Sequence, residues 1–235
     1  MIDIHSHILP GIDDGASDLD ASVTLVSELA RGGVTDVIAT PHYVEETIYT
    51  SPKNSNLKLI GELRERLEAE GINVKIYLGN EIYITPQILK LLADGEISSL
   101  SDSKYLLVEL PMSGDFPGYS DIFLKLIRAG YFVILAHPER YTSFVDDFSL
   151  VLELFEMGVL FQCNIGSFAG QYGKSAMKLA RKMAKAGMIF TVGSDIHHPR
   201  GDAFMPMALK KISRFYDGAE LEKILVENPK KILTV

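Results

Sequence analysis

The chain has 235 residues, of which 47% are hydrophobic and 23% charged, and its formal net charge at pH 7 is −8. This composition is typical of a globular protein with a substantial core, and the acidic charge argues against binding nucleic acid through a broad basic surface. The single cysteine, Cys163, excludes an internal disulfide and favours a reducing compartment, and its apolar neighbours predict an inert core thiol. The N-terminus lacks the pattern of a signal peptide, and no apolar run approaches the ~18 residues that span a bilayer. We therefore expect a cytoplasmic protein without membrane insertion.

Short apolar segments alternate with amphipathic segments nearly from end to end. Buried strands are predicted where Val, Ile, Leu and aromatic residues gather without regular polar alternation, at 1–7, 34–40, 74–82, 104–111, 131–138, 159–166 and 188–196. Helical periodicity predicts helices at 19–30, 57–69, 119–128, 148–156 and 174–186, with a last helix and a short closing segment in 217–233. The motifs RGGV, AEGI, RAGY, EMGV and KAGM place a glycine between helix and strand, where helices commonly end in a left-handed residue.

Seven strands with intervening helices and no linker-like stretch predict one α/β domain over residues 1–235, either a (β/α) barrel or a related fold. The stretch 43–54 is the most loop-like part of the chain and is expected at the rim, where it could form a lid.

Histidines and acids gather at the ends of the predicted strands, where parallel barrels carry their chemistry. Any one of these residues alone is more commonly a core or surface residue, but several independent strand ends agree. The candidate metal ligands are His5, His7, Asp14, His42, Glu81, Glu109, His137, Asp195 and His197. The sixth histidine, His198, is left over.

His5 and His7 are two residues apart on a strand, so both side chains face one way and can bind one ion. Imidazole and carboxylate ligands without cysteine suit Zn, Mn or Fe, and nine candidates suggest two or three ions. Such ions would let an acidic protein bind an anionic group such as phosphate.

The motifs DIHSH, TPH, GNEI, ELP, HPER and GSDIH occur in this order across nearly the whole chain. With them the sequence resembles the polymerase and histidinol phosphatase (PHP) superfamily, and HSHILPGIDDG, GNEIYI and AHPERY are most similar to its bacterial capsule-operon branch. The resemblance implies a manganese-dependent protein-tyrosine phosphatase with a distorted (β/α)7 barrel and a three-metal centre. The implied partner is a phosphotyrosine protein, an autophosphorylating tyrosine kinase that controls polysaccharide export.

The resemblance also implies three ligand sets. They are His5, His7, Glu81 and Asp195; then Glu81, Glu109 and His137; and finally Asp14, His42 and His197. Many superfamily members have a histidine where this chain has the Asp13-Asp14 pair. The resemblance favours Asp14 as the ligand, and Asp13 is expected to cap the turn around Gly15.

Two arginines are candidates for binding the substrate phosphate. Arg140, in HPER, matches a phosphate-binding arginine of the branch, with a surface ion pair as the alternative. Arg200, in HHPRGD, is a second candidate, although the family usually has a longer stretch before its arginine. Tyr43 and Tyr141 follow candidate ligands and could flank an aromatic substrate.

The expected reaction is hydrolysis of a phosphomonoester by a metal-bound hydroxide that attacks phosphorus in line. Arg140 would neutralise the phosphoryl oxygens, and His42 or Asp195 could pass a proton to the leaving group. The alternatives are a small-molecule phosphatase of the histidinol-phosphatase type, a nuclease or phosphoesterase acting on nucleic acid, and a non-catalytic metal-binding subunit. The sequence leaves open the metal (Mn, Fe or Zn), the physiological substrate and the oligomeric state.

Overall fold

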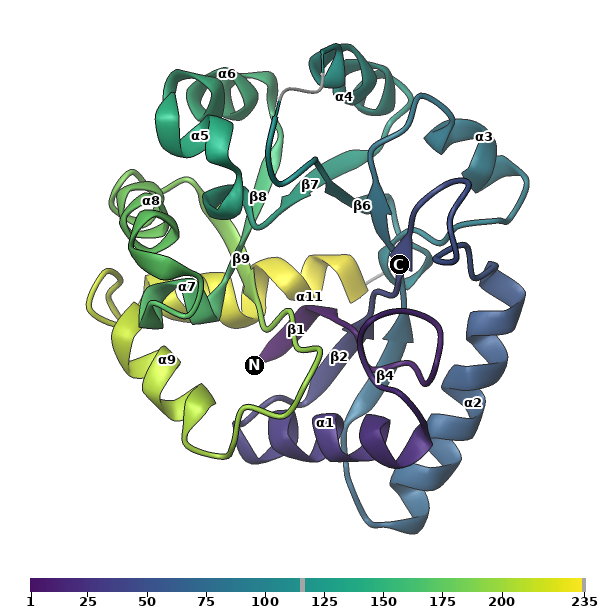
Figure 1. Cartoon of the computed structure of the whole chain (residues 1–235). Helices are drawn as coiled ribbons and strands as arrows, with labels where there is room; N and C mark the ends of the chain where they lie inside the picture. Colours follow the sequence, from purple (N-terminus) through teal and green to yellow (C-terminus); the bar gives the residue numbers. More distant parts are fainter. Residues whose placement is uncertain (115–116, 234–235) are drawn as a thin grey trace.

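A computed structural model describes residues 1–114 and 117–233 (Figure 1). The strands in this part of the chain are β1 Ile2–Ser6, β2 Asp36–Ala39, β3 His42–Tyr43, β4 Lys75–Leu78, β5 Glu81–Tyr83, β6 Tyr105–Glu109, β7 Phe132–Ala136, β8 Leu160–Asn164 and β9 Ile189–Gly193.

Helices connect these strands. They are α1 Leu19–Arg31, α2 Lys53–Ala69, α3 Ile88–Ala93, α4 Tyr119–Arg128, α5 Thr142–Asp146, α6 Ser149–Met157, α7 Ile165–Ala169, α8 Gly173–Lys185, α9 Phe204–Ile212, α10 Gly218–Glu222 and α11 Asn228–Leu233, with single turns at Leu100–Asp102, Pro138–Arg140 and Lys223–Glu227. The helices expected from periodicity are confirmed within a few residues of their bounds. The sequence did not predict α3, α5, α7 and α9, which have five to nine residues and show little periodicity.

The glycines of the five helix-to-strand motifs adopt left-handed backbone conformations. Their φ angles lie between 66° and 94° at Gly33, Gly71, Gly130, Gly158 and Gly187. A residue with a side chain adopts this conformation at a cost, so the predicted helix ends are confirmed.

The strands form two parallel sheets, in the orders β1-β2-β4 and β3-β5-β6-β7-β8-β9. Only two residues separate β2 from β3, and two separate β4 from β5. In each pair the first strand belongs to the smaller sheet and the second to the larger sheet, so the chain passes from one sheet to the other within one strand position. Pro41 lies at the first division and cannot donate a ladder hydrogen bond. Asn80 lies at the second, and its side-chain amide donates to the Pro41 carbonyl over 3.1 Å. The predicted strand 74–82 is therefore interrupted at Gly79 and Asn80.

The seven predicted strand positions are all present, but β9 and β1 share no continuous ladder in the described residues. They meet through a single parallel bridge between Ser6 and Ile196. The amide of Asp195 donates to the His5 carbonyl over 2.9 Å, and that of His7 to the Ile196 carbonyl over 3.0 Å. The structure shows an α/β fold with parallel sheets, and the predicted (β/α)7 barrel is confirmed only in part.

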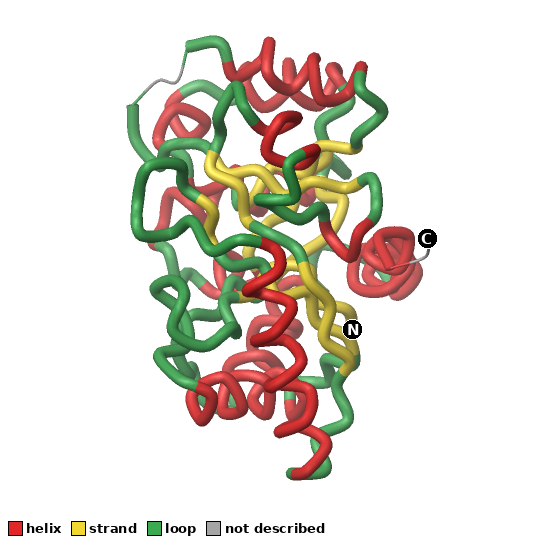
Figure 2. The backbone as a smooth tube through the Cα atoms, turned by 90° about the vertical axis from the view of Figure 1, so that its right-hand side faces the viewer, coloured by secondary structure: helices red, strands yellow, loops and turns green. Residues whose placement is uncertain are grey.

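Two hydrophobic clusters fill this fold. The larger one packs the helices against the strands, with Leu29 of α1 and Val133 of β7 among its members. The smaller one joins Ile4, Ile134 and Ile232, so α11 packs against the strands. Figure 2 shows α11 and both chain ends on one side of the strands and long loops on the other. Within the described residues, every helix is too short or too polar to cross a membrane.

Candidate metal centre

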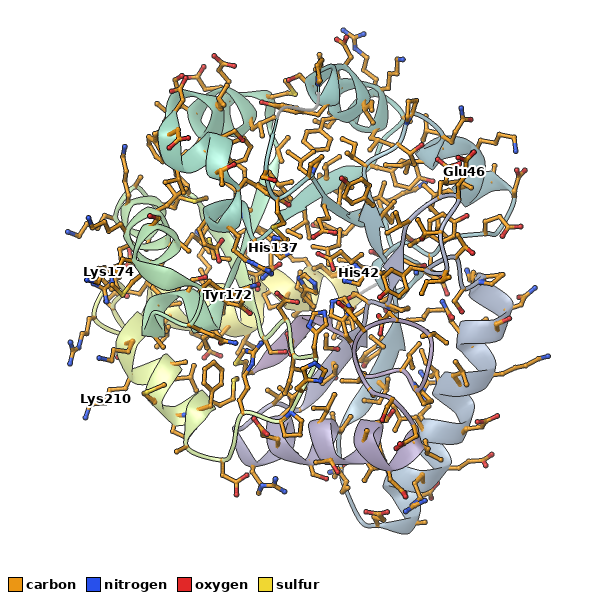
Figure 3. The ribbon with its side chains drawn as sticks, in the orientation of Figure 1. His42, Glu46, His137, Tyr172, Lys174 and Lys210 are labelled. Carbon is orange, nitrogen blue, oxygen red and sulfur yellow. The ribbon has the colours of Figure 1, made fainter. Side chains whose placement is uncertain are left out.

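The nine candidate ligands lie together on the loop side of the strands. Each occupies the end of a strand or the segment just after it, except His42 and Glu81, which begin the short strands β3 and β5. Figure 3 shows His42 and His137 near the middle of the molecule, although β4 to β7 separate them in sequence. The structure therefore brings together the side chains that the sequence predicted to converge.

Glu81 occupies the centre of the cluster. Its Oε2 atom lies 3.1 Å from His5 Nε2, 3.2 Å from His7 Nε2 and 3.1 Å from His42 Nδ1. The same oxygen is buried and accepts a hydrogen bond from none of these rings. The Nε2 atoms of His5 and His7 also lie only 3.2 Å apart. Several donor atoms thus converge on one point, as they do around a cation.

The donor atoms form three overlapping groups whose members lie within 4.8 Å of one another. These groups are His5, His7 and Glu81; His42, Glu81 and Glu109; and His7, Asp14, His42 and His197. The remaining candidates lie alongside, because Asp195 Oδ1 is 3.6 Å from His5 Nε2 and His137 Nε2 is 2.8 Å from Glu81 Oε1. The groups resemble the three implied sets, with His7 and His42 placed between two groups each.

Neighbouring side chains orient the imidazole rings. His5 Nδ1 lies 2.8 Å from Gln162 Oε1, and His7 Nδ1 lies 2.9 Å from Asp13 Oδ2. When a polar partner holds one ring nitrogen, the other is left with its lone pair towards the cluster. This arrangement is the usual support of a histidine that binds a metal.

The two adjacent aspartates have different positions. Asp13 is buried, and its Oδ1 accepts a hydrogen bond from the Gly15 amide over 2.9 Å, as the sequence predicted. Asp14 is half exposed, and its Oδ1 lies 3.2 Å from His197 Nε2 and 3.4 Å from His42 Nε2. The geometry supports the prediction that Asp14 is the ligand, and it gives Asp13 the role of holding His7.

Two candidate ligands have unusual backbone conformations. The φ angle is 33° at His137 and 50° at Asp195, in the left-handed region that residues other than glycine rarely adopt. Such strain is found mostly where a side chain must be aimed at a functional site. His137 directly follows β7, and Asp195 lies two residues after β9, both strands of the larger sheet.

The carboxylates of the cluster occupy a crowded, buried environment. Burial and the adjacent Glu81 raise the pKa of Glu109 to about 9. Burial disfavours charge on Glu81 as well, but His5 and His42 hold the pKa of that carboxyl well below its ordinary value. A carboxyl that favours its neutral form beside another carboxylate indicates a shortage of positive charge, which divalent cations would supply.

Both predicted arginines lie at the edge of the cluster. Arg140 donates from Nη1 to Asp195 Oδ2 over 2.7 Å. Arg200 donates to the backbone carbonyls of Ser194 and Asp195 over 2.8 Å and 2.7 Å, so much of its guanidinium supports the loop after β9. Arg140 and Arg200 line one hollow of about 430 Å³ together with Asp14, Asp195 and His197. Their binding of phosphate stays a prediction.

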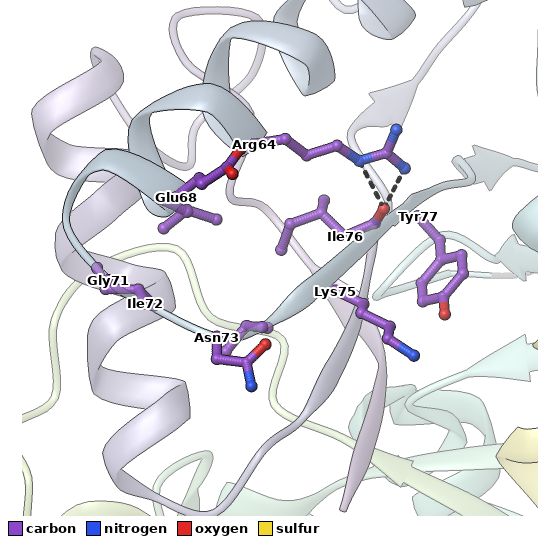
Figure 4. A pocket seen from close by; sticks show the side chains of 10 residues that line it. Arg64, Glu68, Gly71, Ile72, Asn73, Lys75, Ile76 and Tyr77 are labelled. Atoms are coloured by element: carbon purple, nitrogen blue, oxygen red, sulfur yellow. Dashed lines mark hydrogen bonds between the residues drawn. The ribbon is translucent and has the colours of Figure 1, made fainter.

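A second hollow, of about 610 Å³, lies between α2 and β4 (Figure 4). Arg64 crosses it and donates to the Ile76 carbonyl. The lining residues, from Arg64 to Tyr77, include none of the nine candidate ligands. Position and donor atoms thus favour the smaller hollow as the reactive one.

The expected role of the two tyrosines is wrong. Tyr141 is fully buried, and its hydroxyl donates to the Ala136 carbonyl over 2.8 Å and accepts from the Leu110 amide over 3.0 Å. Tyr43 is also buried in the core. The sequence could not show this, because the direction of a side chain after a strand depends on the local backbone. Cys163 is buried as expected, and burial raises the pKa of its thiol well above the ordinary value.

Sequence reasoning missed three residues at the cluster. Gln162 and Asn164 of β8 form a chain of hydrogen bonds, from His5 through both amides to Asp195 Oδ2. Two polar residues at a spacing of two in an otherwise apolar strand were the available signal. Tyr172 lies at the edge, and its ring centroid is 4.5 Å from the Arg140 guanidinium carbon.

Comparison with known proteins gives consistent matches over the full length. The family described as capsular polysaccharide synthesis, CpsB/CapC, matches residues 1–234. The chain is 34% identical to the tyrosine-protein phosphatase YwqE of Bacillus subtilis, covering 99% of this chain and 91% of YwqE. It is 30% identical to the tyrosine-protein phosphatase CpsB of Streptococcus pneumoniae, covering 99% and 98%.

A solved structure agrees with these sequence matches. It comes from the crystal structures of YwqE from Bacillus subtilis and CpsB from Streptococcus pneumoniae, which are described as unique metal-dependent tyrosine phosphatases. The TM-score is 0.91 at 34% identity, and the match covers 99% of this chain and 94% of the other. The two structures therefore share the fold over their whole length.

Proposed function

Because the chain belongs to the CpsB/CapC family of capsular polysaccharide synthesis, we propose that it is a metal-dependent protein-tyrosine phosphatase. The relatives named above are tyrosine-protein phosphatases at 30% and 34% identity over nearly their full length. The observation in the structure that supports this proposal best is the convergence of imidazole nitrogens on the unpartnered Glu81 Oε2.

The residues present fit divalent cations. The donor set is imidazole and carboxylate only, which suits Mn²⁺, Fe²⁺ or Zn²⁺. Within the described residues, buried Glu81 Oε2 and His42 Nδ1 lie 3.1 Å apart and both lack hydrogen-bond partners, so these atoms are free to bind a cation. We propose two or three ions, held by His5, His7, Asp14, His42, Glu81, Glu109, His137, Asp195 and His197, with manganese as the physiological metal.

Divalent ions at this site supply positive charge for a phosphate and lower the pKa of water. The protein's own groups would do the rest. Arg140 is poised at the hollow to bind phosphoryl oxygens, because its guanidinium offers a planar pair of donors. Arg200 keeps the loop of Asp195 and His197 in place and can add a second contact.

A tyrosine leaving group requires little general-acid catalysis from the protein. Its phenol has an ordinary pKa of about 10, so its departure needs little help from an acid. His42 and Asp195 stay as the candidate groups for moving a proton, since both lie in the cluster. Cys163 is buried away from it, so the proposal needs no covalent intermediate on cysteine.

The proposed partner is a phosphotyrosine protein, and an autophosphorylating tyrosine kinase of capsule synthesis in the cytoplasm fits the family best.

Two sheets that meet at Ser6 and Ile196 are consistent with a distorted (β/α)7 barrel in one domain, 1–235.

The test compares the Mn²⁺-loaded protein with the chelated protein on a phosphotyrosine peptide, histidinol phosphate and a DNA oligonucleotide. We expect metal-dependent hydrolysis of the peptide above both others. His7→Ala should lower kcat/KM by about a hundredfold or more, because a shared ligand is lost. Preference for histidinol phosphate would contradict the tyrosine-phosphatase proposal.

Arg140→Ala tests the phosphate contact separately. Loss of a charge-assisted pair should lower kcat/KM by about tenfold to a hundredfold while metal content stays unchanged. Arg128→Ala, at the exposed end of α4, is the matched control and should leave both values as they are. Equal activity of the two variants would remove Arg140 from the site.

A further inference from the structure

The hollow beside the metal centre adjoins another hollow, of about 620 Å³, which is lined by residues of α5 and of the start of α8. Figure 1 shows these two helices close to each other at the edge of the molecule. Arg140 and Tyr172 line both hollows. A molecule bound at Arg140 can therefore extend from one into the other.

Tyr172 is a fixed wall between the two hollows. The Arg140 guanidinium carbon lies 4.5 Å from the centroid of its ring. Its hydroxyl accepts from Arg200 Nη2 over 3.2 Å and donates to Asp195 Oδ2 over 3.4 Å. A ring held at its face and at its hydroxyl separates the hollows without closing either. Figure 3 shows Tyr172 between the central histidines and the outer surface of α8, where Lys174 lies.

The adjoining hollow has a mainly uncharged lining. Val145 of α5 is apolar yet 38% exposed, and the buried Ala176 of α8 also belongs to the lining. Ser175 and Thr142 add hydroxyl groups, and Asp146 is the exposed carboxylate of this lining. An apolar ligand side chain would cover Val145 and remove its surface from water, whereas an acidic one would meet Asp146.

We propose that this hollow binds the side chain next to the phosphotyrosine in a peptide substrate, and that it prefers an uncharged apolar side chain. The inference rests on the proposed phosphatase function and names the sequence preference of that site. Consecutive Cα atoms lie about 3.8 Å apart, so a residue one or two positions from a phosphotyrosine at Arg140 can reach the adjoining wall. The hollow lies on one side of Arg140. We therefore expect the peptide residues on only one side of the phosphotyrosine to affect kcat/KM.

The experiment uses phosphotyrosine peptides with Leu, Gly or Asp placed at the first two positions on either side, together with p-nitrophenyl phosphate. We expect Leu to raise kcat/KM by about tenfold over Gly on one side only, as burial of one apolar side chain allows. Asp at the same position should be no better than Gly.

Two variants change the hollow without touching the metal centre. Val145→Asp adds charge to the lining, and Ser175→Phe fills the space from an exposed helix position. Both should abolish the Leu preference and leave p-nitrophenyl phosphate hydrolysis within about twofold. Leu152→Asp is the matched control, because Leu152 of α6 is 43% exposed and lies outside the lining.

The outcomes separate the two proposals. A Leu preference that is absent from the parent protein, or unchanged in Val145→Asp and Ser175→Phe, would overturn the subsite alone. Parallel loss of p-nitrophenyl phosphate hydrolysis in these two variants would also overturn the subsite, because their effect would then lie at the metal centre. A parent protein that hydrolyses neither substrate would overturn the proposed function and the subsite with it.

Discussion

Asp13 and Asp14 are neighbours in sequence, yet their carboxylates serve different partners. Asp13 is buried and contacts His7 Nδ1, the Gly15 amide and the His42 amide through its two oxygens. Asp14 faces the donor group of His7, His42 and His197. One carboxylate therefore positions His7, and the other has the geometry of a metal ligand itself.

This difference predicts different effects on metal binding. Asp14→Asn should reduce the number of bound ions by one, because an anionic donor is removed from its group. Asp13→Asn should keep the number and weaken the affinity by about tenfold to a hundredfold, since only the support of His7 changes.

Metal analysis after gel filtration, together with titration calorimetry, measures both quantities. His198→Ala is the control and should keep the full metal content, because His198 is exposed and belongs to none of the donor groups. Loss of one ion from both Asp13→Asn and Asp14→Asn would show that their roles are not distinct.

The segment between β1 and α1 is an element whose backbone touches the site directly. The Ala16 amide donates to the His7 carbonyl over 3.0 Å, and the Gly11 amide donates to the Ala16 carbonyl over 2.8 Å. A Cβ atom on Gly15 would lie 2.1 Å from that His7 carbonyl oxygen. The loop can lie over His7 only because residue 15 has no side chain.

Gly15→Ala should therefore destabilise this element. We expect the free energy of unfolding to fall by about 1–3 kcal/mol, the usual cost of overpacking, and metal affinity to fall with it. Denaturant titration of the metal-free protein measures the first effect.

Gly61→Ala is the matched control in the middle of α2, where an added Cβ meets nothing within 4 Å. It should raise stability by about 0.5–1 kcal/mol, because alanine favours the helix. Equal stability of Gly15→Ala and the parent would mean that the loop adjusts freely.

At the scale of the whole molecule, the cluster joins segments from His5 to His197 across both sheets. β1 and β9 are connected by one bridge and few hydrogen bonds, so ligands from both sides would tie the sheets together. A cation that binds only the folded state stabilises it by mass action.

Metal should therefore raise the melting temperature. A free metal concentration a hundred times Kd adds about 2.7 kcal/mol per site, which corresponds to roughly 5–10 °C for a chain of this size. Calorimetry with MnCl₂ and then with chelator measures the shift. His7→Ala should lose most of this increase in melting temperature. An unchanged melting temperature under saturating metal would contradict the prediction that bound metal ties the two sheets together.

Several features could be predicted from the sequence because they depend on local order. Apolar periodicity indicated the main helices and all seven strand positions, and glycine positions indicated the helix ends. Parallel strands present their carboxyl ends at one edge, so strand order alone brought His5, Glu109 and His137 to one side. The motifs indicated the family, and the family match confirms it.

Other features were decided only by contacts between distant segments. At the break in the predicted strand 74–82, Asn80 donates to the Pro41 carbonyl of a distant segment. The different positions of Asp13 and Asp14 depend on how one loop folds over His7, and His5 is supported by Gln162 from another strand. The sequence suggested that Tyr141 could flank a substrate, whereas tertiary packing buries Tyr141 and places Tyr172 beside Arg140 at the edge of the cluster. A sequence determines which side chains a strand can offer, but their directions and partners are set by surfaces that meet only in the folded chain.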